Sequence, residues 1–311
     1  HEPALPSDVH ILSWMLEDPH QQLPEHREPR ARLAQEEALH RVLSGLGPSE
    51  LLSLLHDSRS CVRVHAVRAL GRRATDLAGT EVRQTLEELL LKDPCPEVCQ
   101  EAAVAVGSLV LAAGGDWRRE ASAIATLVRV LLLDYVEATR NTCDKVLERL
   151  FVGMPLPTHL HYAREGHEIE RTYAVKTLAA KFSEHPDQGR WQVLHVLEEA
   201  FSRDKSWRVK EVAVRGLGDL GIRDPAGAGM TVVHALRRFL REEQATMLAQ
   251  LLKKEPKELE EGRRVQDACK EVLAMCALSL AFFGWKSARR QGEQMSEQSA
   301  LPAIKWYVRA A

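Results

Sequence analysis

The sequence predicts an all-α fold, an α-solenoid of about seven stacked helix pairs, and three observations lead to it. A phrase recurs in which an acidic turn residue is followed, six positions later, by a mostly basic residue and then by a run of Ala, Val, Leu and Gly. Its clearest copies are 57–71, 93–107 and 204–218. Successive acidic turn residues are roughly 31 to 41 residues apart, which is the period of stacked helical repeats. Aromatic residues make up only 5% of the chain, which suits helices packed closely through small side chains.

Each unit is predicted to begin with an amphipathic first helix, because its apolar residues recur at helical spacing. The clearest of these first helices are Ser49–His56, Glu81–Lys92, Arg119–Leu133, Arg190–Arg203 and Thr231–Glu243. A short turn ends each of them. Asp93 and Pro94 form one such turn, since proline cannot continue a helix and disfavours helical geometry at the residue before it.

A second helix follows the turn in each unit. In the first clear copy, the apolar residues fall on one face of a helix and are expected in the core: Val62, Ala66, Ala69 and Leu70. A glycine comes near the predicted end of three second helices, where it suits either a C-cap or a close helix crossing. These glycines are Gly71, Gly107 and Gly218.

The solenoid is expected to occupy residues 1–283. Its units are roughly 7–46, 48–73, 80–113, 119–152, 155–183, 188–221 and 229–283. The last unit contains a charged insertion, 241–264, which we expect to be a helical extension with a solvated turn, serving as a regulatory or partner-specific arm. Residues 284–311 are expected to form a linker and a C-terminal capping segment, because a terminal repeat has no neighbour to cover it. The chain begins with His1, so we expect it to be a piece of a longer protein.

The bulk composition argues against some classes of partner. The formal net charge is -2 at pH 7, so no global positive field attracts nucleic acid or an anionic membrane, and neither is expected as a partner. The longest apolar run, 272–285, is too short to span a bilayer comfortably and fits a buried helix better. The six cysteines lie mostly within apolar helical patterns. We interpret them as small buried side chains of an intracellular, cytoplasmic protein.

The phrase from Asp57 to Gly71 resembles the HEAT repeat, an armadillo-like helical family, and the resemblance extends over most of the chain. Armadillo repeats proper are the near alternative, but no consistent third helix is visible. In HEAT repeats the turn aspartate and the second-helix arginine form a hydrogen-bonded ladder from repeat to repeat. The resemblance implies a structural ladder whose pairs match by residue type: Asp57 with Arg63, Asp134 with Arg140, Glu165 with Arg171, and Asp204 with Lys210.

Two units depart from this ladder, because Asp93 faces Cys99 in one of them and Glu260 faces Gln266 in the last unit. We expect the unit with Cys99 to interrupt the ladder. The ladder arginines are interpreted first as structural and not as anion-binding residues, because charged pairs partly shielded from water hold structure more strongly than exposed pairs do.

A further row of positions lies five residues beyond each ladder arginine, on the more exposed flank of the second helix. It holds Arg68, Val104, Lys145, Lys176, Arg215 and Glu271. We hypothesise that its basic members, Arg68, Lys145, Lys176 and Arg215, bind an acidic segment of a protein partner on the concave face, which second helices usually line. The alternative is that these long side chains only solvate a helix face.

Aromatic residues near helix starts form a second candidate surface. Trp191, Phe201 and Trp207 lie close together in the sequence. Tryptophans often anchor protein interfaces, but packing between adjacent repeats is the more ordinary role and is the one we expect here.

Catalytic chemistry has little support in the sequence. A Gly-rich phosphate loop, a nucleophile elbow and a helical His-Glu-x-x-His are all missing. Deoxyhypusine hydroxylase, an enzyme of similar repeats, needs several His-Glu pairs for its two irons, and this chain has one internal pair, His167 and Glu168. Cys95 and Cys99 have neither the spacing nor the second pair of a zinc knuckle.

The expected function is therefore that of a non-catalytic protein-interaction scaffold. We expect no catalytic residue, metal, cofactor or small-molecule substrate. Two alternatives stay open. One is a HEAT-like enzyme or enzyme subunit, of the lyase or metal-dependent hydroxylase type, since bilin lyases share the Ala-Val-x-Ala-Leu-Gly phrase. The other is a nucleic-acid-associated scaffold, which would show steeply salt-dependent binding to DNA or RNA.

Overall fold

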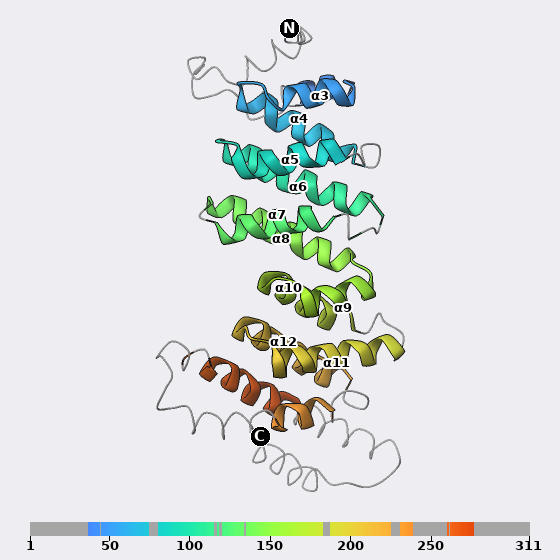
Figure 1. The fold of residues 1–311 in the computed structure, drawn as a ribbon, viewed down its shortest axis with the longest axis vertical. Coiled ribbons are helices and arrows are strands. Elements are labelled where there is room, and N and C mark those ends of the chain that lie inside the picture. Colours follow the sequence, from blue (N-terminus) through green and yellow to red (C-terminus); the bar gives the residue numbers. More distant parts are fainter. Residues whose placement is uncertain are drawn as a thin grey trace. The chain divides into compact units, whose positions relative to one another are not determined.

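The computed structural model describes residues 37–43, 45–74, 80–114, 117, 120–133, 135–182, 187–224, 231–238, 260 and 262–276. Within these ranges the regular structure is helical throughout, without strands (Figure 1). This confirms the predicted all-α solenoid of stacked helix pairs. Most of the predicted first unit, most of the charged insertion 241–264 and the segment 284–311 lie outside the described residues.

The chain divides into two compact units, each described here by itself: unit 1 is His1–Met154 and unit 2 is Pro155–Ala311. The described part of unit 1 begins with the helical residues 37–43 and continues with three helix pairs. They are α3 (Pro48–Leu54) with α4 (Ser60–Arg72), α5 (Thr80–Lys92) with α6 (Pro96–Ala112), and α7 (Ala121–Leu132) with α8 (Glu137–Gly153). Each first helix packs on its own second helix, and the second helices pack extensively on one another, α4 on α6 and α6 on α8.

Unit 2 repeats the same plan. Its helices are α9 (Leu156–Glu165), α10 (Glu168–Ala180), α11 (Asp187–Arg203) and α12 (Trp207–Arg223), followed by helical residues 231–238 and 262–276. The second helices α10 and α12 again make the most extensive contact between pairs. Because every second helix is covered by a neighbour, its apolar face is buried; Val209, Ala213 and Val214 on α12 are fully buried.

The predicted core face of α4 is buried as expected. Val62, Ala66 and Leu70 have no exposed surface, and Ala69 is 1% exposed. Proline helps to place two helix starts, because Pro48 and Pro96 are the first residues of α3 and α6, where a missing backbone N–H costs nothing. The spacing of the apolar residues and the prolines at the turns together therefore position these helices.

The glycines of the recurrent phrase mark close helix crossings. A Cβ added to Gly107, in the middle of α6, would lie 2.5 Å from Cγ1 of Val146 on α8. A Cβ on Gly71 would lie 2.9 Å from Cβ of Ala105 on α6. Among the described residues only Gly114 has a positive φ, of 69°. Of the two roles that the sequence leaves open for these glycines, the close crossing is the one observed.

The cysteines are thiols without disulfides: all six are free. Cys99, Cys143, Cys269 and Cys276 are buried, whereas Cys61 and Cys95 are half-buried. Burial raises the pKa of the Cys143 thiol to about 12, with a smaller contribution from Cys99. Burial, followed by the charge of Asp93, raises the pKa of Cys99 to about 11.

We therefore expect iodoacetamide at pH 8 to alkylate Cys61 and Cys95 well before the buried thiols, because the thiolate is the nucleophile and Cys99 and Cys143 stay protonated. Peptide mapping by mass spectrometry over a time course measures the order. Equal rates for Cys143 and Cys95 would contradict the packing described above.

Candidate functional site

The acidic residue of the recurrent turn organises the turn itself. In three copies its carboxylate accepts a hydrogen bond from the backbone N–H two residues later. The donor is Arg59 for Asp57, at 2.9 Å, and Cys95 for Asp93, at 2.8 Å. Asp204 accepts from Ser206 in the same way, at 2.8 Å. This is the Asx-turn geometry, which explains why aspartate recurs at the position between the two helices.

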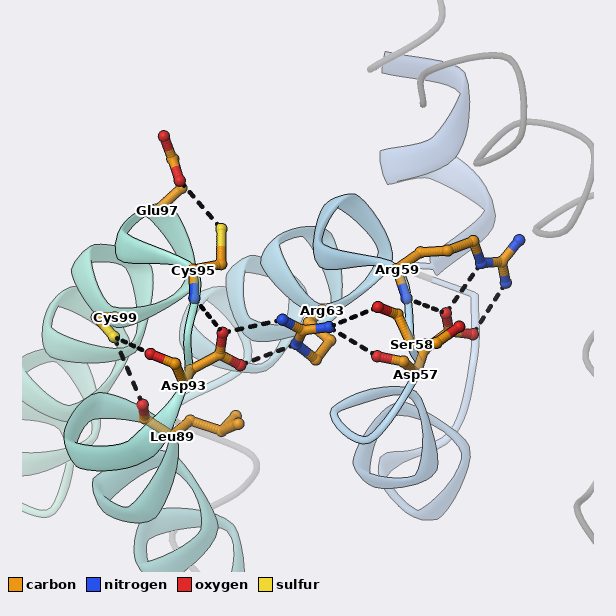
Figure 2. A network of polar contacts seen from close by, with 9 residues as sticks. All are labelled: Asp57, Ser58, Arg59, Arg63, Leu89, Asp93, Cys95, Glu97 and Cys99. Carbon is orange, nitrogen blue, oxygen red and sulfur yellow. Dashed lines mark hydrogen bonds and ion pairs between the residues drawn. The ribbon is translucent and has the colours of Figure 1, made fainter. Parts of the chain in front are cut away.

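Arg63 connects one turn to the next (Figure 2). Its Nε donates to Oδ2 of Asp93 at 2.8 Å and its Nη2 donates to Oδ1 at 2.9 Å, a bidentate pair between positions 30 residues apart. Its Nη1 donates to the backbone oxygens of Asp57 and Ser58 at 2.8 and 3.1 Å. The two side chains are only 11% and 3% exposed. The carboxylate of Asp93 raises the pKa of Arg63 through these hydrogen bonds.

Unit 2 contains the same arrangement of an arginine that binds the aspartate of the following turn. Nε of Arg171 donates to Oδ2 of Asp204 at 2.7 Å and Nη2 donates to Oδ1 at 2.9 Å. Nη1 of Arg171 donates to the backbone oxygen of Gly166 at 2.8 Å, in its own turn. The hydrogen bonds that Arg171 donates to the Asp204 carboxylate raise the pKa of Arg171. Each arginine thus closes its own turn through the backbone and binds the following turn through the carboxylate.

The pairing differs from the one expected within a repeat. The carboxylate of Asp57 binds Arg59, with Nη2 to Oδ2 and Nε to Oδ1 both at 2.9 Å, while Arg63 extends to Asp93. Arg59 is the residue that sequence reasoning missed, although its position two residues after the aspartate is visible in the sequence. The side chain of an arginine in a second helix is long enough to reach the next turn, so sequence proximity did not identify its partner.

Cys99 performs only half of the arginine's role. Its thiol lies 3.4 Å from the backbone oxygen of Asp93 and 3.7 Å from that of Leu89, so it reaches the turn that precedes its own helix (Figure 2). A thiol is too short to go further. Asp93 was expected to interrupt the ladder, but its carboxylate binds Arg63 and so belongs to the ladder. The interruption lies at Cys99, which has no guanidinium group to bind the following turn.

The other members of the expected ladder are placed as follows. Asp134 lies outside the described residues, and Arg140 is half-buried on α8. Glu165 is exposed at the end of α9, and Lys210 is half-buried on α12. The structural ladder remains a prediction at these positions.

The Arg59 contact gives a pH prediction. Hydrogen bonds from Arg59 are the main reason that the pKa of Asp57 is lowered. A carboxylate whose pKa is lower in the folded state stabilises the fold above its unfolded-state pKa of about 4, and this contribution is lost as the pH falls through the folded-state pKa. Asp57→Asn should therefore reduce the acid-induced loss of stability, measured by urea unfolding between about pH 6 and pH 2. Identical pH profiles for the two proteins would contradict this assignment.

The basic row lies on the second helices, as expected from its register. Arg68 is half-buried on α4, while Lys145 on α8, Lys176 on α10 and Arg215 on α12 are exposed. Arg68 forms an ion pair with Glu101 at 2.8 Å, and Arg215 pairs with Glu211 at 2.7 Å. The charges of Arg68 and Arg215 are therefore partly neutralised, each within its own unit.

The aromatic candidates separate into different environments. Phe201 is 1% exposed and belongs to the core of unit 2, as expected. Trp191 on α11 is 62% exposed, so inter-repeat packing is the wrong role for it. Trp207 lies beneath two guanidinium groups, with the Cζ atoms of Arg208 and Arg264 at 5.6 and 5.4 Å from its ring centroid. Such cation–π contacts hold the indole in place at the start of α12.

The histidine and cysteine pairs singled out by the sequence have local structural partners. The backbone N–H of His167 donates to Glu170 at 2.7 Å, which caps the start of α10. The thiol of Cys95 donates to Glu97 at 3.0 Å, and this hydrogen bond lowers the pKa of Glu97. In the described part of the chain, no group of three or more His, Cys, Asp and Glu side chains could hold a metal ion. None of the described helices is long and apolar enough to cross a membrane.

Comparison with known proteins shows what part of this chain is similar to. Residues 48–148 match the family model of HEAT repeats. No curated protein matches the chain. Solved structures with similarity include an engineered protein of the Northeast Structural Genomics Consortium, at 19% identity over 72% of this chain and 96% of that one, with a TM-score of 0.31. A designed armadillo repeat protein in complex with the peptide (KR)4 is 17% identical over 71% of this chain and 98% of that one, with a TM-score of 0.30.

Proposed function

We propose, from the premise that this chain is a HEAT-repeat protein, that it is a non-catalytic scaffold that binds an acidic segment of a partner protein. The HEAT and armadillo repeat fold is typically a protein-interaction scaffold and typically not an enzyme. The observation that carries the proposal is the recurrence of a solvent-accessible basic side chain at one register of the second helices: Arg68, Lys145, Lys176 and Arg215.

The ion pairs within the row do not prevent binding. The side chains of Arg68 and Glu101 are 38% and 26% exposed, and those of Arg215 and Glu211 are 68% and 23% exposed. Exposed ion pairs contribute only about 0–1 kcal/mol. A carboxylate of a partner can therefore replace the internal acid at little cost, and contacts within one unit add up when they lie on one partner segment.

The test is affinity capture of partners with the chain and with a variant carrying Arg68→Glu, Lys145→Glu, Lys176→Glu and Arg215→Glu. We expect this variant to lose the partner at physiological salt. The matched control reverses four basic residues on first helices, Lys92, Arg129, Arg203 and Arg238, and should keep it. Capture that is unchanged in the first variant, or stoichiometric iron or zinc in the purified protein, would contradict the proposal.

A further inference from the structure

A groove of about 260 Å³ lies between α6 and α8 in unit 1. Its floor is apolar: Val146 and Leu150 of α8 are buried there, and Leu111 of α6 is half-buried. Val104 of α6 lines the same groove and is 41% exposed. The helices cross closely at Gly107, where an added Cβ would lie 2.5 Å from Cγ1 of Val146, and the groove opens beside this crossing.

The charged residues that line this groove are both basic. Lys145 and Arg149 are exposed on α8, one helical turn apart, so they flank the same stretch of the groove. Among the residues that the structure describes, neither side chain forms a hydrogen bond or an ion pair. Arg68, by contrast, is paired with Glu101. The uncompensated positive charge near this groove is therefore carried by the two residues that border its apolar floor.

The register of the repeats connects this groove with the basic row. Val104 occupies the position that holds Arg68 in the preceding unit and Lys145 in the following one. The row thus changes from basic to apolar at the place where the groove opens. A volume of about 260 Å³ is below the roughly 300–1,000 Å³ of small-molecule sites, and it suits the insertion of one or two apolar side chains.

We propose that this groove binds an acidic peptide segment of a partner protein, with an apolar side chain inserted against Val104, Val146 and Leu150 and flanking carboxylates on Lys145 and Arg149. The inference rests on the proposed scaffold function and assigns it a site. Residues four apart on a helix are separated by about 6 Å along its axis. Two carboxylates at positions i and i+4 of a helical segment, or i and i+2 of an extended one, match that spacing.

The experiment selects peptides from a displayed random library against the full chain and measures their binding by fluorescence anisotropy. We expect the selected peptides to carry a bulky apolar residue flanked by Asp or Glu. Val104→Glu, and Lys145→Glu together with Arg149→Glu, should each weaken binding by at least about tenfold. The matched controls are Val152→Glu, a valine of α8 that is 44% exposed and does not line the groove, and Arg129→Glu on α7; both should bind within about twofold of the parent.

A charge swap separates binding from folding. The Lys145→Glu and Arg149→Glu variant should regain binding to a peptide in which Lys replaces the flanking acids, which an unfolded variant cannot do. Peptides without acidic residues, binding that is insensitive to all groove variants, or a self-association that Val104→Glu abolishes would each overturn the proposal. If the groove variants have no effect but reversal of the four-residue row still abolishes partner capture, the scaffold function stands and the groove assignment falls.

Discussion

Replacement of Arg63 by alanine should destabilise the protein by about 3 kcal/mol, the loss typical of breaking a buried ion pair. The substitution leaves the carboxylate of Asp93, which is only 3% exposed, without its bidentate partner. It also removes the donor that closes the turn through the backbone oxygens of Asp57 and Ser58. Urea unfolding followed by circular dichroism measures the change, and the transition assigned to unit 1 should move to lower urea.

The same helix supplies the control. Arg68→Ala removes an arginine whose ion pair with Glu101 is equally short, at 2.8 Å, but whose side chain is 38% exposed. We expect a loss below about 1 kcal/mol, because solvent screens such a pair. The double-mutant cycle of Arg63→Ala with Asp93→Ala should give a large coupling energy. Equal losses for Arg63→Ala and Arg68→Ala would show that burial of the first pair has no energetic consequence.

Gly107→Ala should also be strongly destabilising, by about 1–3 kcal/mol, as is usual for overpacking. In an unobstructed helix the same substitution would stabilise by about 1 kcal/mol, because alanine has the higher helix propensity. Here the new Cβ would lie 2.5 Å from Cγ1 of Val146, so α6 and α8 must separate. Thermal unfolding should therefore show a lower midpoint where propensity alone predicts a higher one.

Gly153→Ala is the matched control within α8. Its Cβ would meet only the terminal Cδ2 of Leu111, at 2.9 Å, which can rotate away. We expect its stability to stay within about 0.5 kcal/mol of the parent. Val146→Ala should relieve the clash, so the double variant with Gly107→Ala should be more stable than the sum of the two single effects. Strict additivity would contradict a steric origin.

The helix pairs could be predicted because their signals are local. The apolar period that places Val62, Ala66 and Leu70 on one face needs only a few turns of sequence, and Pro96 marks the start of α6 directly. Helix boundaries depend on more than the apolar period. The predicted first helix Arg190–Arg203 begins three residues earlier in the structure, at Asp187, directly after Pro186 in the sequence, and it includes Gly189.

The contacts between repeats could not be predicted in the same way. The resemblance implies a ladder from repeat to repeat and pairs Asp57 with Arg63 by residue type, but residue type alone does not identify the carboxylate that the arginine side chain binds. In the structure, Arg59 takes the Asp57 carboxylate and Arg63 binds Asp93. One of these two arginines binds the carboxylate of its own turn and the other binds that of the next turn. Which one does which depends on how the next turn approaches in three dimensions.

Exposure was the other property that the sequence could not supply. Phe201 and Trp191 have similar apolar character and lie on the same helix, yet one is 1% exposed and the other 62%. The groove was missed for the same reason. The sequence shows that Arg149 is one helical turn beyond Lys145. Only the structure shows that both residues line a groove whose floor includes the apolar side chain of Val146.

Arg63 binds the carboxylate of the following turn, and this contact affects where the chain can be divided into fragments. A fragment that stops at Lys92, the last residue of α5, ends one residue before the carboxylate that Arg63 needs. A fragment that continues through Cys95 keeps both that carboxylate and the backbone N–H that orients it. Recombinant pieces, and any natural exchange of repeats, should therefore be divided beyond a turn aspartate and not at a helix boundary.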